Sequence, residues 1–369
     1  MIATGGRASR WAAITILILG VVSFTYFIVF EILGYYDFAI INTKARESLK
    51  NSTSQTMSDI KTQSDKPEPQ PVAKKQTAAG NQLENFASMQ TNPAKNIGIY
   101  ISNSPDDPAA LGVLNWVKSA GFDTVYNYSI IDGTPEQISW YLDQANARGI
   151  KVIISLKDLY DELPGGASTA TRHPEFGSTN EQIAQNITAR YGSHPGVWGF
   201  AITDEAPMDF SQLGQWKPIL QRRYNIVKSV TSKPVMSVLV GKTSPNANDR
   251  RSFLSSLKSS TDSFALDYYP VPFQDHNFIQ QIGSDMPAAG DNNGWFITQV
   301  FSWSRYPDTA RALGFNLGVA RQPTLNEIVG MSKLALSGGA KNILFYSYFD
   351  ISGDPSQLNN VAAAVRALR

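Results

Sequence analysis

From Asn96 to the C-terminus, short apolar runs alternate with longer segments in which apolar residues recur at helical spacing. The short runs have the length and composition of buried strands, and the longer segments have the periodicity of amphipathic helices. Eight strand candidates occur, at residues 97–102, 124–129, 151–158, 197–205, 234–240, 263–270, 295–303 and 342–350. Eight strand–helix alternations predict an α/β fold, a (β/α)8 TIM barrel, and a doubly wound open sheet is the alternative.

The connections before and after these strands differ in length. The segments that lead from a helix to the next strand are short, such as SAG, RG and SGGA, whereas long segments follow the third, sixth and seventh strands. Barrel enzymes build their active sites from the loops that follow the strands. The asymmetry therefore predicts a site at the C-terminal ends of the strands.

The first 95 residues have a different pattern. After a short tail at 1–10, the run at 11–30 contains no charged residue and is long enough for a helix that crosses a bilayer. Trp11 at one end and Tyr35 and Tyr36 at the other fit an aromatic belt. We expect a transmembrane anchor at 11–34, and a cleaved signal peptide is the alternative. Residues 35–95 are expected to form a polar flexible linker, in which NQLENFASMQ is compatible with a short helix.

Composition argues against several classes of partner and cofactor. Lys and Arg number 32 and Asp and Glu 31, so the formal net charge of +1 gives no indication of a nucleic-acid partner. The chain contains no cysteine, and its three histidines, His173, His194 and His276, are scattered in sequence. We therefore expect neither a metal nor a cofactor.

The fourth strand candidate ends in two acids, within GFAITDEAP. Strict alternation separates its residues into one face with Trp198, Phe200, Ile202 and Asp204 and another with Gly199, Ala201, Thr203 and Glu205. The bulky face suits the layer beneath the helices, and the small face suits a crowded barrel interior. Glu205 should then point into the barrel mouth, and Asp204 should point away and brace a loop or cap the next helix. The alternative is that both acids are solvated turn residues.

The sixth and eighth strand candidates carry further acids and aromatic rings. Asp267 shares a face with Ala265, so it also should aim at the barrel mouth. The eighth ends in YSYFD, which places Tyr346, Tyr348 and Asp350 on one face, inward or outward. Apolar faces of sugars stack on aromatic rings. Besides Glu205 and Asp267 as catalytic candidates, the expected substrate contacts are Tyr100, Asn127, Asp204, Tyr269, Gln299, Trp303, Tyr348 and Asp350.

Two segments carry a resemblance to a known superfamily. HPGVWGFAITDEAP resembles the fourth strand of glycoside hydrolase barrels of clan A, and RQPTLNEIVGMSKLALSGGAKNILFYSYFD resembles the last helix and strand of beta-galactosidase-like barrels. The resemblance covers about residues 96–369. It implies that Glu205 is a general acid/base and that the substrate is a carbohydrate. It also favours a cytoplasmic N-terminus, and therefore a single-pass cell-membrane protein whose barrel lies outside the cytoplasm.

One departure from that superfamily concerns the second carboxylate. Retaining members place a nucleophilic Glu at the end of the seventh strand, where this chain has Gln299. Because glycoside cleavage ordinarily needs two carboxylates, Asp267 is the first candidate, Asp350 the second and Asp158 the third. GFAITDE also has the glycine-to-Glu spacing of family 18 chitinases, without their additional acids.

Three functions follow from these observations. The first is a membrane-anchored glycoside hydrolase, with Glu205 as acid and Asp267 as base or nucleophile. The second is a barrel that binds glycans and has lost catalysis, which Gln299 favours. The third is a cytoplasmic metabolic barrel for phosphorylated substrates, which the missing glycine-rich phosphate loop disfavours.

Overall fold

The computed structural model describes residues 76–160, 174–208, 210–240, 246–272, 276–289 and 293–369. All of them belong to one compact unit, Val72–Arg369. In this described part, none of the helices combines the length and the apolar character that crossing a membrane requires. The expected tail, the expected anchor at 11–34 and the linker up to residue 75 fall outside it.

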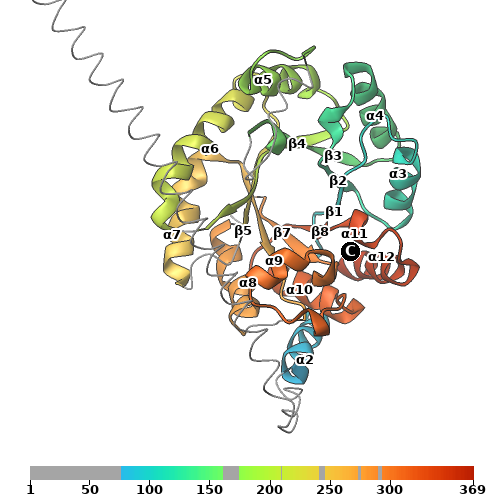
Figure 1. Ribbon diagram of the computed structural model, residues 1–369, viewed down its shortest axis with the longest axis vertical. Coiled ribbons are helices and arrows are strands. Elements are labelled where there is room, and N and C mark those ends of the chain that lie inside the picture. Colours follow the sequence, from blue (N-terminus) through green and yellow to red (C-terminus); the bar gives the residue numbers. More distant parts are fainter. Residues whose placement is uncertain (1–75, 161–173, 209, 241–245, 273–275, 290–292) are drawn as a thin grey trace, which may run out of the picture. The chain divides into compact units, whose positions relative to one another are not determined.

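The described residues form eight parallel strands that close into a barrel (Figure 1). Each strand pairs with the next along the chain, and the last closes the barrel by pairing with the first, for example Asn96 with Asn342. The strands are β1 Asn96–Ile101, β2 Thr124–Asn127, β3 Lys151–Ser155, β4 Val197–Pro207, β5 Val235–Val240, β6 Ser263–Tyr268, β7 Trp295–Gln299 and β8 Asn342–Tyr346. The predicted barrel is confirmed, and the open-sheet alternative is wrong.

Helices surround this barrel (Figure 1). They are α2 Gln76–Ala87, α3 Ala110–Ser119, α4 Pro135–Ala147, α5 Asn180–Tyr191, α6 Leu213–Lys228, α7 Ala247–Leu257, α8 His276–Ala289, α9 Pro307–Ala312, α10 Leu325–Ser337, α11 Tyr348–Ile351 and α12 Pro355–Leu368. Local sequence fixes several of their starts. Thr134 with Gln137 and Thr324 with Glu327 form capping boxes at α4 and α10, which satisfy backbone N–H groups that a helix start leaves unpaired.

Two apolar layers hold the fold together. The outer layer joins the strands to the helices and contains, for example, Ile99, Phe200 and Leu266. The interior cluster comes from the strands alone, and consists of Tyr100, Tyr126, Ile153, Ala201, Met236, Val238, Ala265, Trp295, Ile297 and Leu344. Side chains therefore fill the barrel, and a ligand can reach it only from an end.

Helix α2 extends the folded unit toward the N-terminus. It packs on α10, where Leu83 is fully buried and Lys333 Nζ donates a 2.8 Å hydrogen bond to the carbonyl of Ala87. At Gly330, an added Cβ would lie 1.9 Å from the Leu83 carbonyl oxygen. Residues 76–87, which the sequence placed in the flexible linker, thus form part of the domain, and the linker prediction is wrong there.

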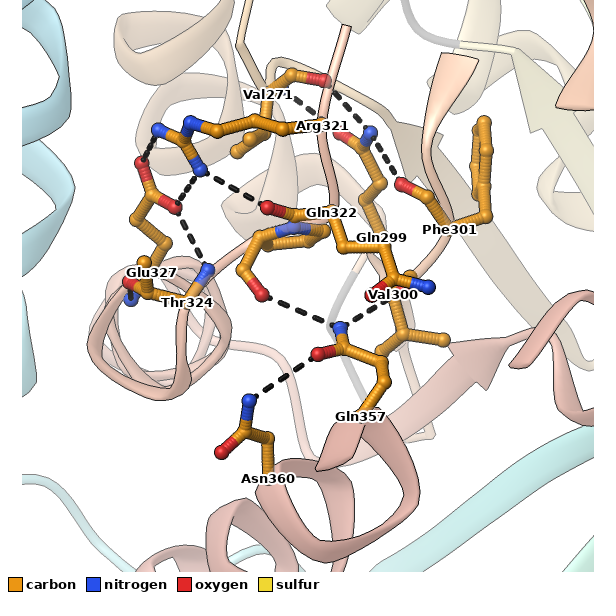
Figure 2. A network of polar contacts seen from close by, with 11 residues as sticks. Val271, Gln299, Val300, Phe301, Arg321, Gln322, Thr324, Glu327, Gln357 and Asn360 are labelled. Carbon is orange, nitrogen blue, oxygen red and sulfur yellow. Dashed lines mark hydrogen bonds and ion pairs between the residues drawn. The ribbon is translucent and has the colours of Figure 1, made fainter. Parts of the chain in front are cut away.

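A polar network fastens the long segment between β7 and α10 (Figure 2). Arg321 donates two hydrogen bonds, of 2.6 and 2.7 Å, to the carboxylate of Glu327. Gln357 Nε2 donates to the carbonyls of Val300 and Pro323, at 3.0 and 3.2 Å. The RQPT motif therefore fixes the start of α10, and α12 ties down both ends of the segment.

Candidate active site

Glu205 of β4 and Asp267 of β6 lie near each other at the C-terminal end of the barrel, close enough for each carboxyl group to shift the pKa of the other. Asp267 is 2 % exposed, and neither of its carboxylate oxygens has an N–H or O–H partner among the other described residues. Two neighbouring carboxyl groups disfavour each other's ionised form. Both pKa values are accordingly raised, as in the carboxyl pairs of acid–base sites.

The environment of each carboxyl group determines its pKa. Burial, followed by the charges of Glu205 and Asp204, raises the pKa of Asp267 well above its usual range. Although part of Glu205 is open to solvent, surrounding protein atoms desolvate its carboxyl group. This desolvation and then the charge of Asp204 raise the pKa of Glu205 to about 7, against the opposing effects of Asp267 and Lys157. Burial thus favours the protonated form of Asp267, and the raised pKa of Glu205 lies near neutral pH.

Glu205 has an unusual backbone conformation. Its φ of 58° makes it the only residue other than glycine with positive φ in the described chain. Such a conformation is strained for a residue with a Cβ, and it is found most often at functional sites. Next to it, the pairing of β4 with β5 shifts register between Ala201 and Thr203 and again between Thr203 and Ala206. These irregularities interrupt the alternation of side chains along β4.

As a consequence, Asp204 also faces the barrel mouth. It accepts a 2.8 Å hydrogen bond from Tyr128 Oη and lies 3.5 Å from Lys157 Nζ, which itself lies 4.1 Å from the centre of the Tyr128 ring. Its negative charge raises the pKa of both Glu205 and Asp267. The expectation that Asp204 points away is wrong, because strict alternation cannot account for the register shifts.

The direction of the Trp198 side chain on β4 also differs from the prediction. This side chain was expected beneath the helices, yet it packs against the interior cluster and meets Trp295 edge-on, with ring centres 5.3 Å apart. The pairing of β3 with β4 shifts register between Val152 and Ile153, which face Val197 and Gly199. Trp198 lies at this irregularity, so its side chain turns inward.

Tyrosine rings line the site. Tyr100 stacks on Tyr126 with ring centres 4.3 Å apart, and it meets Tyr128 at 5.3 Å and Tyr346 at 5.0 Å. Tyr269 continues this wall, 5.6 Å from Tyr346. The hydroxyl of Tyr100 is buried and makes no hydrogen bond with the described residues. The mouth thus combines aromatic faces with unsatisfied polar atoms, as ligand sites do.

Gln299 and Asn127, which were expected to contact the substrate, instead form hydrogen bonds with backbone groups. Gln299 donates to the carbonyls of Val271 and Phe301, at 2.8 and 3.1 Å, and accepts from the Val271 amide at 2.8 Å (Figure 2). Asn127 donates to the Asn103 carbonyl at 3.0 Å and accepts from the amide of residue 129 at 2.9 Å. Both side chains are fully buried, so they position loops around the mouth.

Trp303 and Tyr348 make contacts within the protein. The indole of Trp303 donates a 3.2 Å hydrogen bond to the Tyr269 carbonyl, and the residue is 7 % exposed. Tyr348 packs on Trp116 of α3, with ring centres 4.9 Å apart. The expectation that Tyr348 shares a strand face with Tyr346 is wrong, because β8 ends at Tyr346 and α11 begins at Tyr348.

Asp350 and Asp158 are the two remaining candidates for the second carboxylate. Asp350 accepts hydrogen bonds from Ser347 Oγ at 2.6 Å and from Tyr306 Oη at 2.8 Å, and it lies 3.6 Å from Arg305. These partners make Asp350 a structural carboxylate beside the site. The side chain of Asp158 lies outside the described part.

Sequence reasoning missed Lys157 and Phe349. Lys157 follows β3 in the stretch SLKD, and a lysine just past a buried strand was the available signal. Phe349 packs against the interior cluster from α11, a position that depends on where β8 ends. Among the residues that the structure describes, no three His, Asp or Glu side chains are placed to bind a metal ion.

Comparison with known proteins identifies no family. No family model matches the chain, and no curated protein matches it. Similar solved structures include the spore cortex-lytic enzyme SleL of Bacillus cereus, with 11 % identity, a TM-score of 0.47 and 75 % of each chain covered. Cel5A of Thermotoga maritima in complex with cellobiose has 15 % identity and a TM-score of 0.47, covering 73 % of this chain and 97 % of that one. Tryptophan synthase from M. tuberculosis has 12 % identity and a TM-score of 0.39, covering 79 % and 96 %.

Proposed function

We propose that this barrel is a glycoside hydrolase in which Glu205 is the general acid. The observation that supports this most is the pair of neighbouring acids Glu205 and Asp267, whose pKa values are both raised in a barrel mouth lined by tyrosine rings. A general acid needs a pKa near the working pH, and the pKa of Glu205 is raised to about 7. Its partial exposure lets it reach a glycosidic oxygen and then recover a proton from water.

Asp267 takes a different role in this proposal from the base or nucleophile that the sequence indicated. Both carboxyl groups of a glycosidase act on the reacting sugar, either directly or through a water. Asp267 is 2 % exposed, so its carboxyl group is not open to a sugar carbon or to an attacking water. We therefore assign Asp267 as a positioning residue that lies beside Glu205 and tunes its pKa.

Asp204 is then the candidate for the second carboxylate. It is fixed by Tyr128 and Lys157, and it faces the same mouth as Glu205. When Glu205 gives its proton to the leaving oxygen, the glycosidic C–O bond breaks and positive charge develops on the sugar. In our proposal Asp204 stabilises that charge or accepts the proton of the attacking water.

We also propose that the barrel is tethered to the cell membrane and acts outside the cytoplasm. The support for this is in the sequence, where the charge-free run at 11–30 precedes a polar stretch. A glycan at the cell surface would lie within reach of such a tether.

A barrel that binds glycans without cleaving them is the second candidate. The observation that favours it is Gln299, whose amide occupies the seventh-strand position and is bound to backbone. An aromatic-lined mouth would serve binding equally well. Turnover separates the two candidates.

The experiment compares wild type with Glu205→Gln on natural glycans and on aryl glycosides with good leaving groups. Gln retains the shape and a hydrogen-bond donor but cannot deliver a proton. We expect a loss of about 10²–10⁴-fold on natural glycans, and a smaller loss on the aryl glycosides. Glu136→Gln is the matched control, since Glu136 is a surface carboxylate with 80 % of its side chain exposed.

Two outcomes would contradict the proposal. Wild type that binds a glycan but cleaves none of the panel would establish the binding barrel. If Asp204→Asn were inactive and Glu205→Gln active, the roles of these two acids would be exchanged.

A further inference from the structure

A cavity lies beside the mouth, between the segment that follows β7 and the segment that follows β8. Its volume of about 640 Å³ falls within the range of small-molecule sites. Both segments leave the C-terminal ends of their strands, the end of the barrel that carries Glu205. The residues that line the cavity include Ser302, Ser304, Arg305, Gln322, Phe349 and Ser352.

Phe349 connects this cavity with the mouth. It lines the cavity, and its ring centre lies 6.2 Å from that of Tyr128 and 5.7 Å from that of Tyr346. Tyr128 donates its hydroxyl hydrogen to Asp204. One aromatic surface therefore runs from the carboxyl groups into the cavity, and a chain of sugars that leaves the mouth would cross the ring of Phe349.

Two carboxylates, Asp350 and Asp354, and one guanidinium, Arg305, line the cavity. Asp350 accepts hydrogen bonds from Ser347 and Tyr306. The carboxylate of Asp354 accepts two backbone N–H bonds at the start of α12, of 3.0 and 3.1 Å. Because carboxylates outnumber cations in this lining, it disfavours an acidic ligand relative to an uncharged one.

Polar donors and acceptors remain at the cavity wall. The contact between Arg305 and Asp350, at 3.6 Å, is longer than a hydrogen bond, and 58 % of the Arg305 side chain is exposed. The hydroxyls of Ser302 and Ser304 lie 2.9 Å apart. Hydroxyl groups and a guanidinium beside an aromatic ring match a ligand that has many hydroxyls and one apolar face.

We propose that this cavity is a second sugar subsite and that the substrate is an uncharged oligosaccharide long enough to reach it from Glu205. The inference rests on the proposed function, because it takes the mouth as the site of cleavage. It adds two properties that the carboxyl pair does not imply: affinity that grows with chain length, and preference for neutral over acidic sugars.

The test measures binding and turnover for neutral oligosaccharides of one to six sugars and for an acidic series of oligouronides. Binding is measured by calorimetry in the Glu205→Gln background, so that the ligand stays intact. Each additional hydrogen bond contributes a modest free energy, and a few together make the chain that first reaches the subsite bind about tenfold more tightly.

Ser352→Trp fills the cavity and should abolish this tenfold gain while leaving the shortest ligands unaffected. Ser352→Ala is the matched control and should keep the gain. Ser304→Trp blocks the opposite wall, and it serves as the second variant if circular dichroism shows that Ser352→Trp is unfolded. Gln185→Trp fills a cavity of about 650 Å³ at helices α5 and α6 and should change nothing.

The outcomes separate the two proposals. If affinity rises with chain length, Ser352→Trp abolishes that rise and wild type shows no turnover, the subsite is supported and the hydrolase is overturned. The subsite is overturned if wild type turns over substrate but affinity does not rise with chain length. It is also overturned if Ser352→Trp and Ser352→Ala show the same rise, or if the protein prefers the oligouronides. Binding of neither series overturns both.

Discussion

Asp267 and Glu205 are neighbouring acids at the barrel mouth, and burial raises the pKa of Asp267 well above its usual range. Asp267 lies in the regular part of β6, whereas Glu205 lies at the irregular end of β4 with φ of 58°. The buried Asp267 thus lies beside Glu205, which solvent can reach. The two groups titrate as a unit, and substitutions around them should change the pH dependence of any reaction in which Glu205 gives up a proton.

The alkaline limb of activity should move in opposite directions in two variants. If Glu205 is the acid, kcat/KM falls as pH rises through its pKa of about 7. Asp204 raises that pKa and Lys157 lowers it. Asp204→Asn should lower kcat/KM at every pH, because Asp204 is the proposed second carboxylate, and its remaining activity should show the limb at lower pH. Lys157→Met should move the limb to higher pH. Each shift is expected to be about one unit.

The measurement is kcat/KM against pH for both variants and for Asp308→Asn. Asp308 is on the surface, with 96 % of its side chain exposed, so its loss should leave the limb in place. A limb that moves the same way in Asp204→Asn and Lys157→Met would show that another group controls it.

Asp267→Asn should stabilise the protein at pH 8 and have little effect at pH 5. Asp267 ionises near pH 4 in the unfolded chain, and its pKa in the folded protein is raised by burial. Between these values the folded state binds one proton more than the unfolded state, so the contribution of Asp267 to the free energy of unfolding falls as pH rises. An uncharged Asn avoids this penalty.

Thermal melts of wild type and Asp267→Asn across this pH range check the prediction. Glu136→Gln is the surface control, and its Tm should differ from wild type by the same small amount at both pH values. If Asp267→Asn lowered the Tm most at pH 8, an ionised Asp267 would be stabilising, and its pKa in the folded protein would not be raised.

The regular parts of the chain were predictable, and the irregular parts of the site were not. Alternation placed Asp267 inside the barrel because β6 pairs with β7 in unbroken register. The same reasoning failed for Asp204 and Trp198, since β4 shifts register against both neighbours. Alternation along β8 failed at Tyr348, because the Ser347 side chain accepts a hydrogen bond from the Asp350 amide and starts α11 there.

The role of Gln299 also depends on contacts that are distant in sequence. A polar side chain at the end of β7 was expected at the site, and its position was predictable from the strand pattern. Its three hydrogen bonds to Val271 and Phe301 depend on the path of the loop after β6. No local pattern encodes that path, so the structural role could not be inferred from the sequence.

Gly330→Ala should destabilise the domain by displacing α2. The new Cβ would lie 1.9 Å from the Leu83 carbonyl oxygen, so α2 must move and lose its packing on α10. Overpacking of this kind costs about 1–3 kcal/mol. Gly112→Ala is the matched control: Gly112 lies in α3 with nothing within 4 Å of an added Cβ, and this change should stabilise by about 0.5–1 kcal/mol. Urea denaturation of both variants measures the difference, and equal effects would mean that α2 does not pack on Gly330.

The full chain should be found in the membrane fraction, and a chain that begins at Val72 should be soluble and folded. The reason for the first is the charge-free run at 11–30. The reason for the second is that Val72–Arg369 is one compact unit that includes α2.

A chain that begins at Asn96 provides the comparison, because it lacks α2 and uncovers the face of α10 at Gly330. It should melt at a lower temperature than the chain from Val72, since the buried Leu83 and its neighbours no longer cover that face. Cell fractionation, N-terminal sequencing of the mature protein and thermal melts test these points together. A mature N-terminus beyond Tyr36 would mean that the apolar run is a cleaved signal. Equal melting temperatures would mean that α2 contributes nothing to the barrel and belongs to the linker.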